Sequence, residues 1–354
     1  LLFGAAAAWL GNLQPWIGSF VTLITVWTAS SKYVEGTAFD LLNLFSPKWM
    51  LHHAIATTDV HPPPDMAHLE IDRIQFFSIS IGDSAMASLV ISIVVFGGAT
   101  YWIWKGLHRC FFTPEASLWR KTDTYLVIAS ADVLFLGFSI QYDAPFNSDI
   151  YLHLIVTHLL VFLIAIAALT PQRQTLYDWA RFRHLQRRDP NTKTRSLLKD
   201  LFLSEKSPAL PVITANVAMA TVLLLPGALF NYNVSPWEGG ISLLAASNLI
   251  LIYAAIFQLM LMLKTSKRMV WAWGMVMGSI IAPPLLLSAF PGSSSGVWLF
   301  AVFPVFTEYA FNAEIAVAAQ WLVFGLLCLK LTRQLRKAGA SETKEQFKTV
   351  TVKP

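Results

Sequence analysis

A single carboxylate, that of Asp132, lies deep inside an apolar stretch of the sequence, VIASADVLFLGF. Moving a charged side chain to the centre of a lipid bilayer costs at least about 2.5 kcal/mol, so this residue must face protein or water. Ionisable residues at such depth commonly mark the paths of ions or substrates. We therefore take Asp132 as the candidate for a transport path, with a structural hydrogen bond or a neutral, protonated acid as the alternative.

Two histidines, His153 and His158, lie in one apolar stretch that is long enough to form a span. A separation of five residues places them about 140° apart on a helix of 3.6 residues per turn, so one ion cannot readily bind both. Each side chain alone has two interpretations. We favour a hydrogen bond that serves packing, and the alternative is ligation of a haem or a pigment.

Four more histidines stand among carboxylates in a polar segment near the beginning of the chain. Histidine and carboxylate together can bind zinc or a similar ion. The spacing here matches no known metal-site signature, and prolines interrupt it. We therefore predict a solvated loop with no metal or other cofactor, and keep a metal site as the alternative for His52, His53, His61 and His68 beside Asp59, Asp65, Glu70 and Asp72.

A basic and aromatic segment, YDWARFRHLQRR, directly follows the apolar stretch that holds the two histidines. Such a segment can lie on the anionic inner leaflet, where each basic residue adds about 1 kcal/mol of attraction. It can equally form the docking surface for a cytoplasmic protein. The candidate contacts to lipid or to a partner are Arg181, Arg183, Arg187 and Arg188.

The elements that must position these residues are apolar helices. Hydrophobic residues make up 55% of the 354 and charged residues only 13%, whereas a soluble domain carries about 25% charged residues. A span needs roughly 20 apolar residues, and about eight stretches qualify. The predicted fold is an all-α, polytopic bundle with spans near 1–28, 82–104, 125–141, 150–170, 212–230, 240–263, 270–290 and 315–331.

The basic residues fall almost entirely on one side of this arrangement. All but Lys32, Lys48 and Arg73 of the 26 lie there, and the positive-inside rule names that side the cytoplasm, together with both ends of the chain. An apolar piece of about ten residues before the last span is too short to cross, and we expect a re-entrant helix there. The chain then divides into spans one to four with an external loop at 29–81 (1–170), a basic cytoplasmic connection (171–210), spans five to eight with a re-entrant segment at 291–314 (211–331) and a cytoplasmic tail (332–354).

Several catalytic signatures are missing from the sequence. It contains no phosphate loop of the form G-x-x-x-x-G-K-S/T, no G-x-S-x-G elbow and no H-E-x-x-H zinc helix. We expect no enzymatic activity and no catalytic residue, and any ATP must be bound by another chain. The net charge of +5 reflects the cytoplasmic face and does not imply nucleic-acid binding.

The stretch LTPQRQTLYDWARFRH, Leu169–His184, and the preceding WKGLHRCFFTPEASLWRKTDTYLVIASADVLFLGF resemble a group of cyanobacterial membrane proteins of the ABC-2-type permease-like class. The opening LLFGAAAAWLGNLQPWIGSF resembles an interior span of that group. Because the chain begins with Leu1, we expect an N-terminal part upstream. The order of span, tight basic turn, span, re-entrant helix and last span in the second half is similar to the closing half of ABC-2 exporter subunits.

The resemblance implies a multi-pass permease subunit in the plasma or thylakoid membrane. It would work with a separate ATPase subunit, a second permease half and the surrounding membrane lipids. The cytoplasmic helix on which the ATPase docks in that family would precede this chain. Two other function classes stay open, namely a non-transporting accessory or assembly subunit of a larger, for example photosynthetic, membrane complex, and a membrane enzyme that uses the external histidines.

Overall fold

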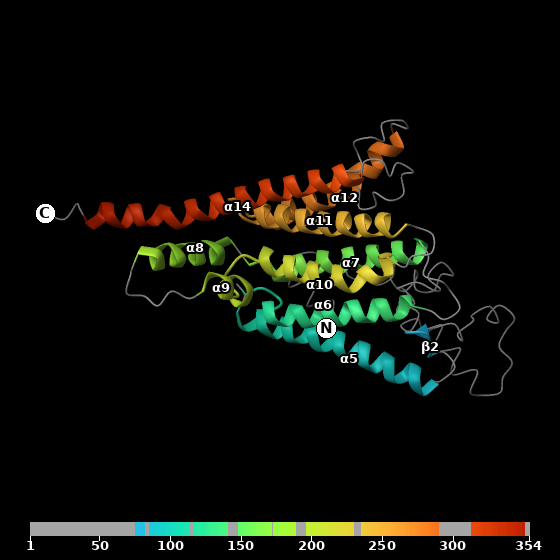
Figure 1. Cartoon of the computed structure of the whole chain (residues 1–354). Coiled ribbons are helices and arrows are strands. Elements are labelled where there is room, and N and C mark those ends of the chain that lie inside the picture. The colour runs from blue at the N-terminus through green and yellow to red at the C-terminus, as the bar shows by residue number, and fades with distance from the viewer. Residues whose placement is uncertain are drawn as a thin grey trace. The chain divides into compact units, whose positions relative to one another are not determined.

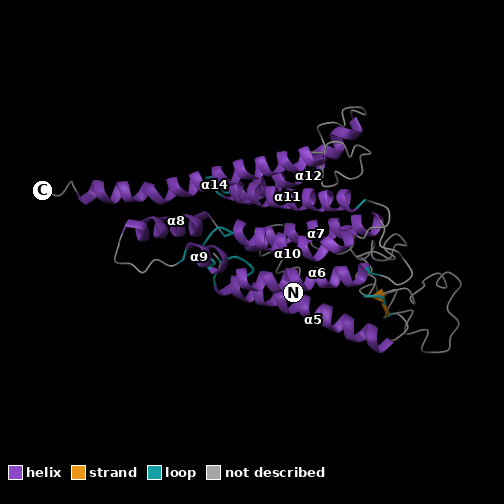
Figure 2. Ribbon diagram, viewed as in Figure 1, coloured by secondary structure: helices purple, strands orange, loops and turns teal. Residues whose placement is uncertain are grey.

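The protein is described by a computed structural model in which most of the described residues belong to helices (Figure 2). The predicted all-α class is confirmed for this part of the chain, where the only strands are two short ones in one hairpin. The structure describes residues 75–81, 85–113, 116–140, 148–171, 173–188, 196–229, 235–289 and 313–350.

Seven helices correspond to seven of the eight predicted spans (Figure 1). The first predicted span, most of the external loop and most of the predicted re-entrant segment lie outside the described residues. The seven helices are α5 (Ala85–Phe112), α6 (Lys121–Ser139), α7 (Ser148–Leu169), α10 (Leu210–Leu229), α11 (Pro236–Leu261), α12 (Arg268–Ala289) and α14 (Ala313–Val350).

Five of these helices, α5, α6, α10, α11 and α14, are long and apolar enough to cross a membrane. A sixth span is obtained if α7 is counted together with α8 (Arg173–Arg188), to which it is joined at a bend of 66°. The chain is therefore an integral membrane protein of the helical type. The count of eight spans, the side on which the termini lie and the re-entrant helix stay predictions.

Helix α11 carries apolar residues on every face, which is the pattern of a helix enclosed by protein or lipid. Pro236 begins this helix, where its missing N–H costs nothing, and Glu238 lies in the first turn, where a negative charge suits the helix dipole. Within the apolar window of α11, 78% of the residues are buried, against 17% for α14. Helix α11 is thus the enclosed member of its part of the chain, and α14 exposes most of its apolar surface.

The chain forms two compact units, the first of which comprises 1–112, 129–160 and 226–236. In it, the end of the predicted external loop forms a hairpin of β1 (Gln75–Phe76) and β2 (Ile79–Ser80). Both turn residues between the strands have positive φ angles, as a two-residue hairpin turn requires. Their backbone N–H groups donate to carbonyl oxygens at the end of α6, so the hairpin is fixed to that helix.

Gly137 makes the close approach of the hairpin to α6 possible. The ring of Phe76 occupies the place where a Cβ atom at position 137 would lie. The same ring packs edge-on against Phe138, with 5.1 Å between ring centroids. Phe138, Ile81 and Val95 are the buried centre of a small apolar cluster between the hairpin, α5 and α6.

The second unit comprises 113–128, 161–225 and 237–354. Its predicted basic connection is folded into α8 and α9 (Leu197–Leu203), and α8 packs along the C-terminal part of α14 (Figure 1). Helix α14 continues well beyond Leu331, where the last predicted span ends. Gly339 allows the two helices to meet, because a Cβ there would lie only 2.8 Å from the carbonyl oxygen of Ala180.

Candidate functional site

The structure brings Asp132 of α6 and His158 of α7 together inside the first unit. The Oδ1 atom of Asp132 lies 2.8 Å from Nε2 of His158. Both residues are buried, with 1% and 3% of their surfaces exposed. Asp132 and His158 are therefore two ionisable groups in direct contact within apolar helices, where a charge is costly.

The other ring nitrogen of His158 contacts the backbone of its own helix. Nδ1 lies 2.7 Å from the backbone carbonyl oxygen of Leu154, which can only accept, so Nδ1 must carry a hydrogen. This bond within α7 holds the imidazole ring with its Nε2 atom beside Asp132.

The contact within the pair is close but not a straight hydrogen bond. The distance of 2.8 Å suits a hydrogen bond, but the angles do not. The carboxyl oxygens of Asp132 and Nε2 of His158 meet the geometry of a hydrogen bond with no partner in the described part of the chain. The ring of Phe135 meets the imidazole edge-on, with 6.0 Å between ring centroids. Apolar surroundings of this kind make each electrostatic contact stronger and each missing contact more expensive.

Antiparallel helices explain why these two residues meet. Asp132 lies eleven residues after Lys121, the start of α6, and His158 lies eleven residues before Leu169, the end of α7. At 1.5 Å per residue, both are about 16 Å from these adjacent helix ends. Because α6 starts at Lys121 and not near Tyr125, Asp132 lies farther from the start of its helix than the sequence pattern indicated.

The sequence predicted that Asp132 faces protein or water and that His158 makes a packing hydrogen bond, but it did not connect the two residues. Their equal distance from one end of consecutive antiparallel helices is the signal that would have found the pair. His153 belongs to α7, but its side chain lies outside the described part. The structure therefore assigns it no role.

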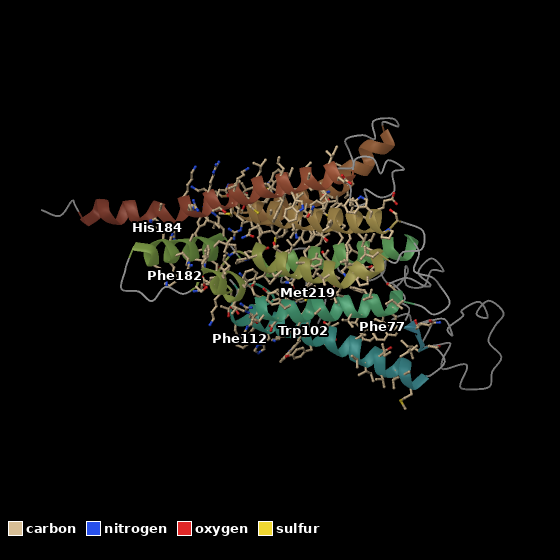
Figure 3. The ribbon with its side chains drawn as sticks, in the orientation of Figure 1. Phe77, Trp102, Phe112, Phe182, His184 and Met219 are labelled. Carbon is tan, nitrogen blue, oxygen red and sulfur yellow. The ribbon has the colours of Figure 1, made fainter. Side chains whose placement is uncertain are left out.

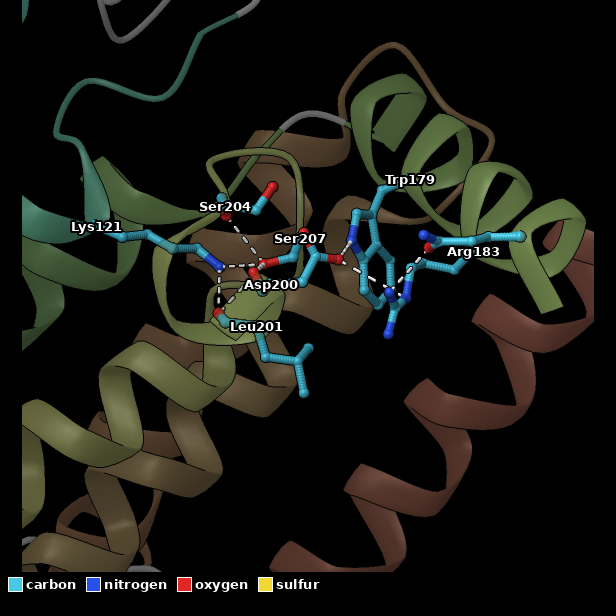
Figure 4. A network of polar contacts seen from close by, with 8 residues as sticks. Lys121, Trp179, Arg183, Asp200, Leu201, Ser204 and Ser207 are labelled. Carbon is cyan, nitrogen blue, oxygen red and sulfur yellow. Dashed lines mark hydrogen bonds and ion pairs between the residues drawn. The ribbon is translucent and has the colours of Figure 1, made fainter. Parts of the chain in front are cut away.

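A second polar cluster, the Lys121 network, lies at the start of α6 in the second unit (Figure 4). The ammonium group of Lys121 donates to the carbonyl oxygens of Leu201 and Pro208, each at 2.8 Å, and to Oγ of Ser207 at 2.5 Å. Lys121 is 2% exposed. An ammonium group has three hydrogens to donate, and all three have an acceptor here, so this buried cation is fully hydrogen-bonded.

Asp200 of α9 joins the neighbouring helix to this cluster. Its Oδ2 atom accepts a hydrogen bond of 2.7 Å from the indole N–H of Trp179 and lies 3.8 Å from Nε of Arg183, both on α8 (Figure 4). The Oγ atom of Ser207 also donates within the α9 region. These bonds hold the turn after α9, the start of α6 and helix α8 together.

The structure separates the four arginines that the sequence grouped as docking candidates. Arg183 contacts Asp200 and donates to Oε1 of Gln186 at 3.1 Å. Arg181 pairs with Asp178 on its own helix at 3.0 Å. Arg187 and Arg188 end α8, and their side chains are not described. Docking of lipid or partner by these arginines stays a prediction.

Other polar side chains in the spans form bonds between helices, such as the contact of 2.7 Å between the hydroxyl groups of Thr221 on α10 and Ser247 on α11. Gln258 of α11 accepts a hydrogen bond of 3.3 Å from the backbone N–H of Leu210 on α10. Asn216 instead donates to Val212 O within its own helix. Among the described residues, the side-chain amide of Gln320 and the amide nitrogen of Asn248 have no hydrogen-bond partner.

The external histidines and their neighbouring carboxylates lie outside the described residues, so the solvated loop stays a prediction and the metal site its alternative. Within the described ranges, no cluster of three metal-ligating side chains is found. Comparison of the chain with protein-family models, curated proteins and solved structures gave no match. The candidate site therefore rests on its own geometry.

Proposed function

We propose that this chain is the membrane permease subunit of an ABC-type exporter, of the ABC-2-like class, energised by a separate ATPase. The observation that supports a transport role is the Asp132–His158 pair in the middle of apolar helices. Buried ionisable pairs are expensive in a membrane and are mostly found where they serve an ion or substrate path. The resemblance to ABC-2 permeases and the missing phosphate loop support the external energy source.

The pair has a chemical property that a transport cycle can use. A carboxyl group and an imidazole can each exchange protons, and both lie among apolar side chains, where a charge is costly. Entry of water or of a cationic group would stabilise the charged state, whereas closure of the helices would favour the neutral one. A change in hydration around α6 and α7 would therefore change the charge of the path.

The test is ATP-dependent export by the complete complex in proteoliposomes. Replacement of Asp132 by asparagine keeps the shape and one hydrogen-bonding group, but the amide cannot take up or release a proton. We expect Asp132→Asn protein to fold and to lose export. Asp123→Asn, the same change in the first turn of the same helix, is the matched control and should keep export. Full export by well-folded Asp132→Asn protein would remove the pair from the mechanism.

A non-transporting accessory subunit is the second candidate function. Its supporting observation is that Asp132 and His158 contact each other and are almost fully enclosed, as a packing pair would be. Purification of the native complex separates the two functions. An ATPase subunit and a second permease half in the complex favour the exporter, and pigment-binding or other assembly proteins without an ATPase favour the accessory subunit.

A further inference from the structure

A cavity of about 730 Å³ lies in the second unit between α8, the start of α9, the start of α10 and α14. Its volume is in the range of sites that hold small organic molecules, which is roughly 300–1,000 Å³. The proposed transport path does not use it. Gly339, where α8 and α14 approach closely, is one of its lining residues.

The charged residues that line this cavity are basic. Arg183 contributes from α8 and Arg336 from α14, and none of the described lining residues is acidic. Asp200 lies behind Arg183, where its Oδ2 atom is 3.8 Å from the guanidinium and already accepts a hydrogen bond from Trp179. Two arginines from two helices thus line the cavity, which suits an anion because arginine binds phosphate through paired N–H groups.

The remaining lining residues are largely apolar. They lie beside the part of α14 where the sequence changes from apolar to basic residues. Leu331 and Leu335 belong to the part of α14 in which Lys330, Arg333 and Arg336 begin to replace apolar residues, and Leu210 begins α10. Figure 3 shows His184, another lining residue, on the side of α8 toward α14, with Phe182 on the opposite side. An apolar wall beside two arginines matches a ligand with an anionic head and a hydrocarbon body.

We propose that this cavity binds an anionic phospholipid. The phosphate would be held by Arg183 and Arg336, and the first part of the acyl chains would lie against Leu210, Leu331 and Leu335. Basic pockets between helices at the membrane surface bind anionic head groups in this manner. The proposal goes beyond the transport function and does not depend on it, since its residues lie on α8, α10 and α14 and not in the Asp132–His158 pair.

The test measures lipid bound to the purified protein by native mass spectrometry, with phosphatidylglycerol and phosphatidylcholine of the same acyl chains as ligands. The variant is Arg183→Gln/Arg336→Gln. The matched control is Arg181→Gln/Arg333→Gln, which removes the same charge from the same two helices outside the cavity. We expect wild type and control to prefer phosphatidylglycerol, and the variant to lose affinity about fivefold for each arginine.

A single replacement guards against loss of the fold, because Arg183 also contacts Asp200. Arg336→Gln alone should weaken phosphatidylglycerol binding about fivefold, and Arg333→Gln alone should leave it unchanged. Equal weakening by both would show general attraction to a basic surface and would overturn the proposal. Displacement of the lipid by inorganic phosphate at equal concentration would also overturn it, because the cavity would then be a site for a free anion.

Discussion

The Lys121 network and the Asp132–His158 pair both bury ionisable groups, but they satisfy them differently. Lys121 uses all three of its hydrogens on oxygen acceptors within 2.8 Å. Asp132 has one close contact, to Nε2 of His158, which is not a straight hydrogen bond. A cation with every donor engaged is fixed in one conformation, whereas a pair with unused hydrogen-bonding capacity can rearrange.

This difference indicates what each cluster is for. The Lys121 network joins chain segments that are 80 to 87 residues apart in sequence, so its bonds stabilise the fold. The pair joins two helices that a loop already connects, and it leaves hydrogen-bonding capacity unused in an apolar setting. We therefore expect substitutions in the network to lower stability, and substitutions in the pair to change function with little effect on stability.

The largest loss of stability should come from Lys121→Met. Methionine keeps an unbranched apolar side chain but removes the donor to the buried carbonyl oxygen of Pro208 and the ammonium contacts to Leu201 O and Ser207 Oγ. We expect the free energy of unfolding to fall by about 3 kcal/mol, since each unsatisfied buried group costs about 1–3 kcal/mol. The measurement is denaturant or thermal unfolding in detergent.

Arg120→Met is the matched control for that prediction. Arg120 is the preceding residue, but its ion pair with Glu205 at 3.4 Å is exposed. Exposed ion pairs contribute at most about 1 kcal/mol, so this variant should stay close to wild type. Equal losses for the two variants would contradict the structural role assigned to the Lys121 network.

Gly339→Leu should have the next largest effect. A side chain at this position would meet Ala180 O and the Cβ of His184, so α8 would have to move away from α14. Overpacking of this kind costs about 1–3 kcal/mol. Gly325→Leu on the same helix is the control, because nothing lies within 4 Å of its Cβ position. The measurement is thermal unfolding. A lower unfolding temperature for Gly325→Leu than for Gly339→Leu would contradict the packing of α8 on α14.

Trp179→Phe should cost about 1 kcal/mol, because it removes one hydrogen bond to Asp200 while it keeps an aromatic ring. Trp271→Phe on α12 is the control, since that side chain is exposed and has no such bond to Asp200. Unfolding in detergent measures both variants. An unchanged stability in Trp179→Phe would show that the bond between α8 and α9 does not stabilise the fold.

Asp132→Asn should change stability least, by less than about 1 kcal/mol, because the amide can still donate a hydrogen bond to Nε2 of His158. Comparison with Lys121→Met by the same unfolding measurement sharpens the contrast between the two regions. A loss in Asp132→Asn as large as in Lys121→Met would mean that the pair is a structural element like the network.

The apolar spans were predictable because each needs many apolar residues in succession, and seven of the predicted stretches form helices. Asp132 was recognisable because a carboxylate is conspicuous in such a stretch. The Lys121 network was not, because its acceptors are mainly backbone carbonyl groups, which every residue has. The packing of α8 on α14 depends on Gly339, whose small size indicates contact only once the partner helix is known.

The central claim, that Asp132 and His158 act as one unit, is tested most directly by a double-mutant cycle on export. ATP-dependent export is measured in proteoliposomes for Asp132→Asn, His158→Gln and the double variant, with folding checked by thermal unfolding. The account predicts that each single variant loses at least about tenfold in rate and that the double variant loses no more than either, as for coupled residues. Full export by either single variant, or independent losses that multiply in the double variant, would contradict it.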